Sequence, residues 1–93
     1  MLFRSKKDPG YRLPESELNA WGYKLIEQDK KNEALEIFKL NINLYPQSWN
    51  VYDSYGEALE GCGKQDDAIK MFKQSLKLNP RNTNAAEHLK HLE

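Results

Sequence analysis

The side chains best suited to chemistry lie near the end of the chain, where His88 and His91 are three residues apart and follow Glu87. Within one helix this spacing brings imidazole and carboxylate groups together, and both are ligands for zinc. A complete site needs further ligands, however, and the two histidines of a metalloprotease helix are four residues apart. We therefore expect no metal at this position and two histidines that face solvent.

Nucleophilic side chains also lack the partners that catalysis requires. Ser48 and Ser54 lie outside any Gly-x-Ser-x-Gly turn and have no evident base, so we interpret them as a helix cap and a helix-surface hydroxyl. Cys62 lies between Gly61 and Gly63 with no charge cluster or histidine at helical spacing, which is typical of an unreactive thiol. We predict that the protein is not an enzyme and needs no cofactor.

The composition narrows the class of protein further. The chain has 93 residues, enough for one small domain, and its 14 Lys and Arg side chains balance 14 Asp and Glu. A net charge of zero disfavours nucleic acid as a partner, because binding to phosphates depends on a basic excess. No apolar stretch approaches the roughly 18 residues of a membrane span, so we expect no membrane partner.

The start of the chain bears on the compartment. Residues 1–3 are followed at once by Arg4, which argues against a signal peptide. We expect a cytoplasmic protein if the chain is complete; for a fragment of a larger protein, no compartment follows. Residues 1–14 carry a net charge of +3, which leaves −3 for residues 15–93. Pro9, Gly10 and Pro14 interrupt regular structure, so residues 1–14 are interpreted as an irregular basic lead-in.

An internal repeat of 34 residues dominates the remainder, because residues 15–48 align with residues 49–82. Eight positions are identical, and most of them are small or apolar, as a packed interior requires. The identical pairs are Gly22 and Gly56, Leu25 and Leu59, Lys30 and Lys64, Ala34 and Ala68, Phe38 and Phe72, Lys39 and Lys73, Leu44 and Leu78, and Pro46 and Pro80.

Apolar residues at helical spacing predict two antiparallel helices in each unit, over 15–28 and 32–45, then 48–61 and 66–79. Pro46 and Pro80 end the second helix of each unit, and Ser48 and Asn82 are placed to cap the helix that follows. A fifth, capping helix is expected over residues 83–93, with Ala86, Leu89 and Leu92 as its apolar stripe. The predicted fold is an all-α solenoid: repeat one over 15–48, repeat two over 49–82, and the capping helix.

Large aromatic side chains fall both on and off this pattern. Trp21, Tyr52 and Tyr55 occupy repeating apolar positions, so we expect them in the core. Tyr23 lies off the apolar stripe and is expected to point into solvent. Gly22, like its counterpart in the second unit, is expected where the two helices of a unit approach closely.

The 34-residue helix–turn–helix unit resembles the tetratricopeptide repeat, over residues 15–92. The residues that carry the resemblance are Gly22, Ala34, Phe38 and Pro46, repeated as Gly56, Ala68, Phe72 and Pro80. Asn41 and Ser75 stand where the family usually has Ala, which predicts looser packing between the units. Asp29 replaces the turn glycine that Gly63 supplies in the second unit.

Resemblance to this family implies a concave groove that binds peptides, lined by the first helix of each unit. The residues that fall on the groove side are Asn19, Tyr23, Ile26, Glu27, Asn50, Asp53, Ser54, Glu57, Glu60, Asn84, Glu87, His88 and His91. The carboxylates of Asp53, Glu57, Glu60 and Glu87 among them make this side acidic, which favours a basic or neutral peptide or protein as the partner.

Some relatives clamp the acidic tails of large heat-shock chaperones with Lys, Asn and Arg on this face. This sequence has Asn19, Tyr23, Ser54, Asn84 and His88 at those places, so we expect negligible affinity for such tails.

Two alternatives to a free-standing interaction module stay open. The two units and one cap are fewer than the roughly three repeats that independent stability usually requires, so the chain could self-associate as a weak homodimer. The segments 38–41 and 45–59 also resemble the repeat tails at the C-terminal end of some bacterial serine hydrolase and β-lactamase-like proteins. That second resemblance implies a structural appendage of a larger bacterial hydrolase. Residues 92–93 are interpreted as native or as the remainder of a tag.

Overall fold

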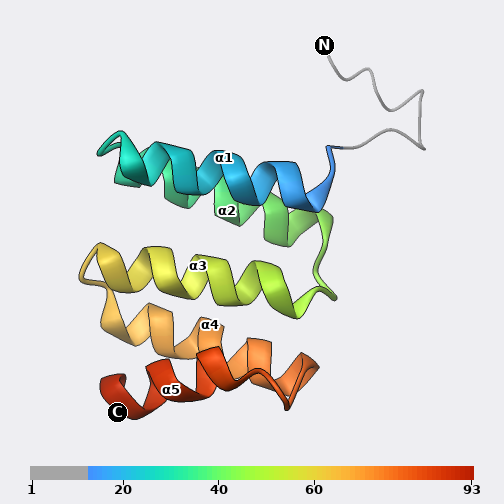
Figure 1. Cartoon of the computed structure of the whole chain (residues 1–93), viewed down its shortest axis with the longest axis vertical. Helices are drawn as coiled ribbons and strands as arrows, with labels where there is room; N and C mark the ends of the chain where they lie inside the picture. Colours follow the sequence, from blue (N-terminus) through green and yellow to red (C-terminus); the bar gives the residue numbers. More distant parts are fainter. Residues whose placement is uncertain (1–12) are drawn as a thin grey trace.

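The computed structural model describes residues 13–93, so the lead-in predicted over residues 1–14 lies almost wholly outside the described residues. Within residues 13–93 the fold is all-α, with five helices and no strand: α1 (Glu15–Glu27), α2 (Lys31–Leu44), α3 (Trp49–Gly61), α4 (Gln65–Leu78) and α5 (Thr83–Leu92). The helices are stacked in chain order along the long axis of the molecule, with adjacent helices packed together (Figure 1). The ends predicted for the first four helices agree within one residue.

Both units turn in the same way between their two helices. Asp29 and Gly63 hold equivalent places and both have a positive φ, 63° and 80°. The next residues close the turns, because the Lys30 amide donates to the Leu25 carbonyl at 2.8 Å and the Lys64 amide to the Leu59 carbonyl at 2.9 Å. Asp tolerates the left-handed conformation better than most residues, so Asp29 preserves the turn.

Each unit is held together by a phenylalanine ring seated on a glycine. The Phe38 and Phe72 side chains are fully buried. A Cβ atom added at Gly22 would lie 2.5 Å from Phe38 Cζ, and one added at Gly56 would lie 2.9 Å from Phe72 Cε1. Because glycine has no Cβ atom, the phenylalanine ring can pack directly against the backbone of the facing helix.

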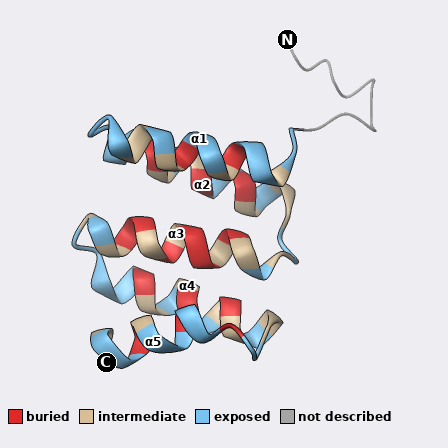
Figure 2. Ribbon diagram, viewed as in Figure 1, coloured by how far each residue is buried: buried red, intermediate tan, exposed pale blue. Residues whose placement is uncertain are grey.

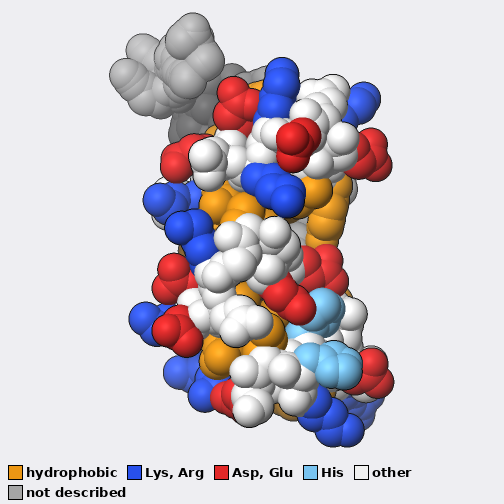
Figure 3. Space-filling model, turned by 90° about the vertical axis from the view of Figure 1, so that its left-hand side faces the viewer, with side chains coloured by type: hydrophobic (Ala, Val, Ile, Leu, Met, Phe, Trp, Pro, Cys, Tyr) orange, Lys and Arg blue, Asp and Glu red, His pale blue; other side chains and the backbone are white. Residues whose placement is uncertain are grey.

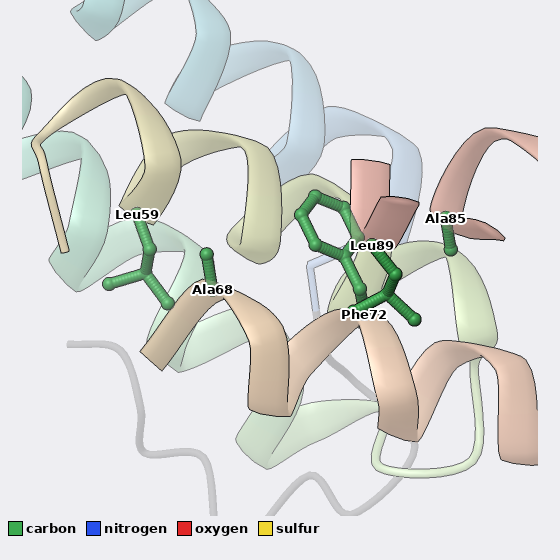
Figure 4. Packing of buried hydrophobic residues seen from close by; sticks show 5 residues of the cluster. All are labelled: Leu59, Ala68, Phe72, Ala85 and Leu89. Carbon is green, nitrogen blue, oxygen red and sulfur yellow. The ribbon is translucent and has the colours of Figure 1, made fainter. Parts of the chain in front are cut away.

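Buried residues line the sides on which the helices face each other (Figure 2). The unit-two cluster consists of Leu59, Ala68, Phe72, Ala85 and Leu89, from α3, α4 and α5 (Figure 4). The unit-one cluster consists of Ala34, Phe38 and Ala58, from α2 and α3. Leu35 and Tyr55 pack against both clusters, so the apolar core is continuous between the units.

The prediction for Trp21 was wrong, because this side chain is 49% exposed. Tyr55, its counterpart in α3, packs against α2, and Leu89, its counterpart in α5, is buried. Both lie on the side of their helix that faces the preceding second helix, and within residues 13–93 no such helix precedes α1. Tyr52 and Tyr55 are half-buried rather than in the core.

Asn41 and Ser75, at which we predicted looser packing between the units, make contacts within their own units. Both side chains are fully buried. The Asn41 amide donates to the Glu15 carbonyl at 3.1 Å, and the Ser75 hydroxyl donates to the Trp49 carbonyl at 2.8 Å. These equivalent hydrogen bonds tie the second helix of each unit to the start of its first helix.

Asn82 caps α5 as predicted, since its Oδ1 accepts from the Ala85 amide at 3.3 Å. Ser48 makes no cap of α3; its hydroxyl instead donates to Glu15 Oε2 at 2.9 Å. Ala86 was predicted on the apolar stripe of α5 but is exposed, and Ala85 is buried instead, because α5 packs against the units that precede it.

A bilayer-spanning helix would need more length and more apolar residues than any of the five described helices has.

Candidate functional site

The predicted groove side carries a network of polar side chains that joins α1, α3 and α5. Tyr23 donates its hydroxyl to Glu57 Oε1 at 2.6 Å, and Asn84 donates its amide to Glu57 Oε2 at 2.9 Å. Tyr23 and Glu57 are one repeat apart in sequence, so equivalent positions of successive first helices contact each other. Glu57 is therefore the residue at which the three helices meet.

Tyr23 was expected to point into solvent, and it does not. Its ring meets the Phe38 ring edge-on, with centroids 5.3 Å apart and an interplanar angle of 73°. Burial raises the pKa of the Tyr23 hydroxyl above its ordinary value, and donation to the Glu57 carboxylate raises this pKa further. Tyr23 stays protonated at any physiological pH, so it acts as a hydrogen-bond donor on this face.

Asp53 is the most deeply placed carboxylate of the network, with only 8% of the residue exposed. Asn82 donates to its Oδ2 at 3.2 Å, and Asn84 donates to Oδ1 at 3.0 Å. Burial raises the pKa of Asp53, while these two amide donors oppose the rise. Asp53 therefore positions Asn82 and Asn84 at the α4–α5 junction. Because it is buried, it offers little surface to a ligand.

His88 reaches back from α5 to α3. Its Nδ1 lies 2.7 Å from Glu60 Oε1, and its Nε2 lies 3.5 Å from Glu57 Oε2. The imidazole stacks on the Phe72 ring, with centroids 4.6 Å apart and an interplanar angle of 12°. A carboxylate only accepts hydrogen bonds, so Nδ1 carries the proton that points to Glu60. Figure 3 shows the two histidines of the chain on one flank of the molecule beside acidic side chains.

The other residues predicted for the groove differ in how much they offer a ligand. Glu27, Glu87 and His91 are exposed, as is Asn84, whereas Ser54 is buried. Ile26 packs against the unit-one cluster. Asn19 is half-buried with its Oδ1 lacking a hydrogen-bond partner, and the Asn50 amide lies 3.5 Å from Glu15 Oε2.

Two residues of the network were missed as groove residues. Glu15 accepts from Ser48, at the end of the first unit, and from Asn50 of the second unit, and Asn82 donates to Asp53 while it caps α5. Asn82 was predicted only as a cap. The signal for Glu15 lies in the repeat, since it holds the first position of its unit and therefore adjoins the loop that enters the next unit.

The arrangement can accept hydrogen bonds and ion pairs from a ligand. The side chains of Glu57 and Glu60 are each 32% exposed, and that of His88 is 27% exposed. Among residues 13–93, no three His, Cys, Asp or Glu side chains are grouped so that they could hold a metal ion. Two hollows lie away from these residues. One, of about 350 Å³, is lined by Asn32, Leu35, Glu36, Lys39, Tyr55, Leu59, Lys64 and Asp67.

The sequence matches no protein-family model, and no curated protein is significantly similar to it.

Proposed function

We propose that this chain is a tetratricopeptide-type interaction module that binds a peptide or a neighbouring protein on the face formed by α1, α3 and α5. Its support is the regular pairing of helices, with a phenylalanine on a glycine in each unit and equivalent turns at Asp29 and Gly63. Nothing in the proposal requires a catalytic residue or a cofactor.

The observation that carries the proposal is the pair of carboxylates at Glu57 and Glu60, one turn apart on α3 and partly exposed. Ordered, partly desolvated carboxylates accept charge-assisted hydrogen bonds from guanidinium or ammonium groups more strongly than neutral acceptors do. Tyr23 and Asn84 hold Glu57 in one orientation. The ligand that suits this face is an extended segment with basic side chains and few acidic ones.

The proposal is tested with two labelled peptides of equal length, one alternating glycine with arginine and the other alternating glycine with glutamate. We expect the arginine peptide to bind and its affinity to fall with added salt, and the glutamate peptide not to bind. The double variant Glu57→Gln with Glu60→Gln should weaken binding by about 1–2 kcal/mol.

The matched control is the double variant Glu33→Gln with Glu36→Gln, which removes the same charge from exposed positions of α2. It should bind the arginine peptide as the wild type does, apart from a small change at low salt. Equal weakening by both double variants, or equal binding of both peptides, would show that net charge rather than this face governs binding.

A second candidate is favoured by one observation, the 49% exposure of Trp21 on the side of α1 that no helix of residues 13–93 covers. We propose that this side packs against another domain or a second copy of the chain, as the structural-appendage and self-association alternatives require. Sedimentation across protein concentrations should then show association that Trp21→Ser removes. The chain fails this test if it sediments as a monomer throughout.

A further inference from the structure

His88 of α5 lies between the carboxylates of Glu57 and Glu60, which the proposed function assigns to binding a ligand. Its Nδ1 is 2.7 Å from Glu60 and its Nε2 is 3.5 Å from Glu57. Stacking on Phe72 fixes the plane of the ring, so both nitrogens stay directed at α3. The imidazole thus adjoins carboxylate oxygens that a ligand's guanidinium would also approach.

The two charge states of the ring act differently on this carboxylate pair. In the neutral ring Nδ1 donates to Glu60, and Nε2 turns an electron lone pair toward Glu57. Protonation makes Nε2 a donor as well and adds a positive charge between the two carboxylates. The charged ring therefore partly neutralises the negative charge of both carboxylates, whereas the neutral ring leaves this charge to attract a cationic ligand.

We infer that His88 sets the ligand preference of this groove: uncharged, it leaves Glu57 and Glu60 to a cationic ligand, and protonated, it competes with that ligand for both. The inference rests on the proposed function. Since acidification favours the charged form of an imidazole, affinity for a basic ligand should fall as the pH is lowered.

Several elements place charged or polar groups around His88. From α3 these are Asp53, Glu57 and Glu60, and from α1 the Tyr23 hydroxyl reaches Glu57. From α4 the facing group is the uncharged Phe72 ring. On α5 itself the neighbours in sequence are Glu87, Lys90 and His91.

These neighbours suggest how to isolate His88 in an experiment. Burial raises the pKa of Asp53, but this carboxylate is common to the wild type and both histidine variants and cancels in their comparison. His91, the other imidazole of α5, is exposed. A His88→Gln variant keeps an amide donor and cannot become charged, while His91→Gln removes the other imidazole of α5.

The test measures binding of the labelled glycine–arginine peptide at about pH 8 and about pH 5.5, at one ionic strength. For the wild type we expect affinity roughly fivefold weaker at the lower pH, the effect of one partly exposed ion pair. His88→Gln should bind with nearly equal affinity at both pH values. His91→Gln should keep the pH dependence of the wild type.

Thermal unfolding at the same two pH values provides a readout without ligand. The melting temperatures of the wild type and His88→Gln are compared at each pH, which separates a loss of binding from a loss of fold. Similar melting of the two proteins at the higher pH also shows that the variant is folded.

The outcomes separate the two proposals. If the peptide fails to bind the wild type at either pH, both the proposed function and the inference drawn from it are overturned. If the peptide binds with equal affinity at both pH values, or if His88→Gln keeps the pH dependence, only the role of His88 is overturned.

Discussion

Asn82 makes three interactions with different elements although it is a single side chain in a loop. Its Oδ1 accepts from the Ala85 amide, while its Nδ2 donates to Ser75 Oγ at 2.8 Å and to Asp53 Oδ2 at 3.2 Å. Only 7% of the residue is exposed. The cap of α5 is therefore tied to α4 and α3 at one point, which orients α5 and the groove residues it carries.

We predict that Asn82→Ala lowers the free energy of unfolding by about 2–3 kcal/mol, because it removes a helix cap and leaves buried polar atoms of Ser75 and Asp53 short of a donor. Chemical denaturation measures this change. The control is Asn79→Ala, in which only a hydrogen bond from the Arg81 amide is lost at an exposed loop. Equal destabilisation by the two variants would contradict a special role for Asn82.

Tyr23 gives a prediction about alkaline pH. Its pKa in the folded protein lies above the ordinary value of about 10, because burial and donation to Glu57 both favour the protonated ring. A raised pKa contributes stability that is fully present below pH ~10 and is lost as the pH rises through the folded pKa.

Tyr23→Phe lacks this contribution, so the stability difference between the wild type and the variant should be constant near neutral pH. It should then narrow above pH ~10, by at most about 1 kcal/mol per pH unit since the ring is partly exposed. Denaturant titrations at several pH values check this. Tyr55, whose pKa burial also raises, is common to both proteins and cancels. A difference that widens with pH contradicts the prediction.

At the scale of the helix pair, the ring-on-glycine contact predicts an order among three glycine variants. Gly22→Ala places a methyl group 2.5 Å from Phe38, and Gly56→Ala places one 2.9 Å from Phe72. Gly61 ends α3 with no atom within 4 Å of an added Cβ. We expect losses of about 2–3 kcal/mol for Gly22→Ala and about 1–2 for Gly56→Ala. Gly61→Ala should be neutral or gain up to about 1 kcal/mol. Thermal and chemical unfolding test this order, and equal effects at Gly22 and Gly61 would contradict it.

The helices themselves could be predicted from sequence because each unit restates the same apolar spacing and ends in a proline. Which sides of α1 are covered by other helices could not be predicted from sequence. Trp21 carries the same signal as Tyr55 and Leu89, and that signal does not say whether a neighbouring helix is present to cover it. The contact of Tyr23 with Glu57 was predictable in principle, since residues one repeat apart adjoin on the groove side, but the contact of Tyr23 with Phe38 depends on side-chain conformation.

At the scale of the whole molecule, an apolar bridge joins the two units, in addition to the hydrogen bond from Tyr23 to Glu57. Leu35 of α2 and Tyr55 of α3 are the side chains that pack against both core clusters. Stability in repeat proteins is the sum of unit stabilities and the coupling between neighbours. Unit two has α2 on one side and α5 on the other, whereas α1 has one side uncovered within residues 13–93. Unit one should therefore depend more on the bridge.

We predict that Leu35→Ala separates the unfolding of the two units, since truncating this side chain costs about 2–3 kcal/mol, much of it at the junction. The two tryptophans report on the units separately: Trp49→Phe leaves Trp21 as the probe of unit one, and Trp21→Phe leaves Trp49 as the probe of unit two. With Leu35 present, both probes should give one coincident denaturation curve, as in a two-state protein. With Leu35→Ala, the Trp21 curve should move to lower denaturant than the Trp49 curve.

The control is Leu40→Ala, which truncates an exposed apolar side chain of the same helix and should leave the two curves together. Curves that stay coincident in Leu35→Ala would mean that coupling between the units does not depend on this bridge.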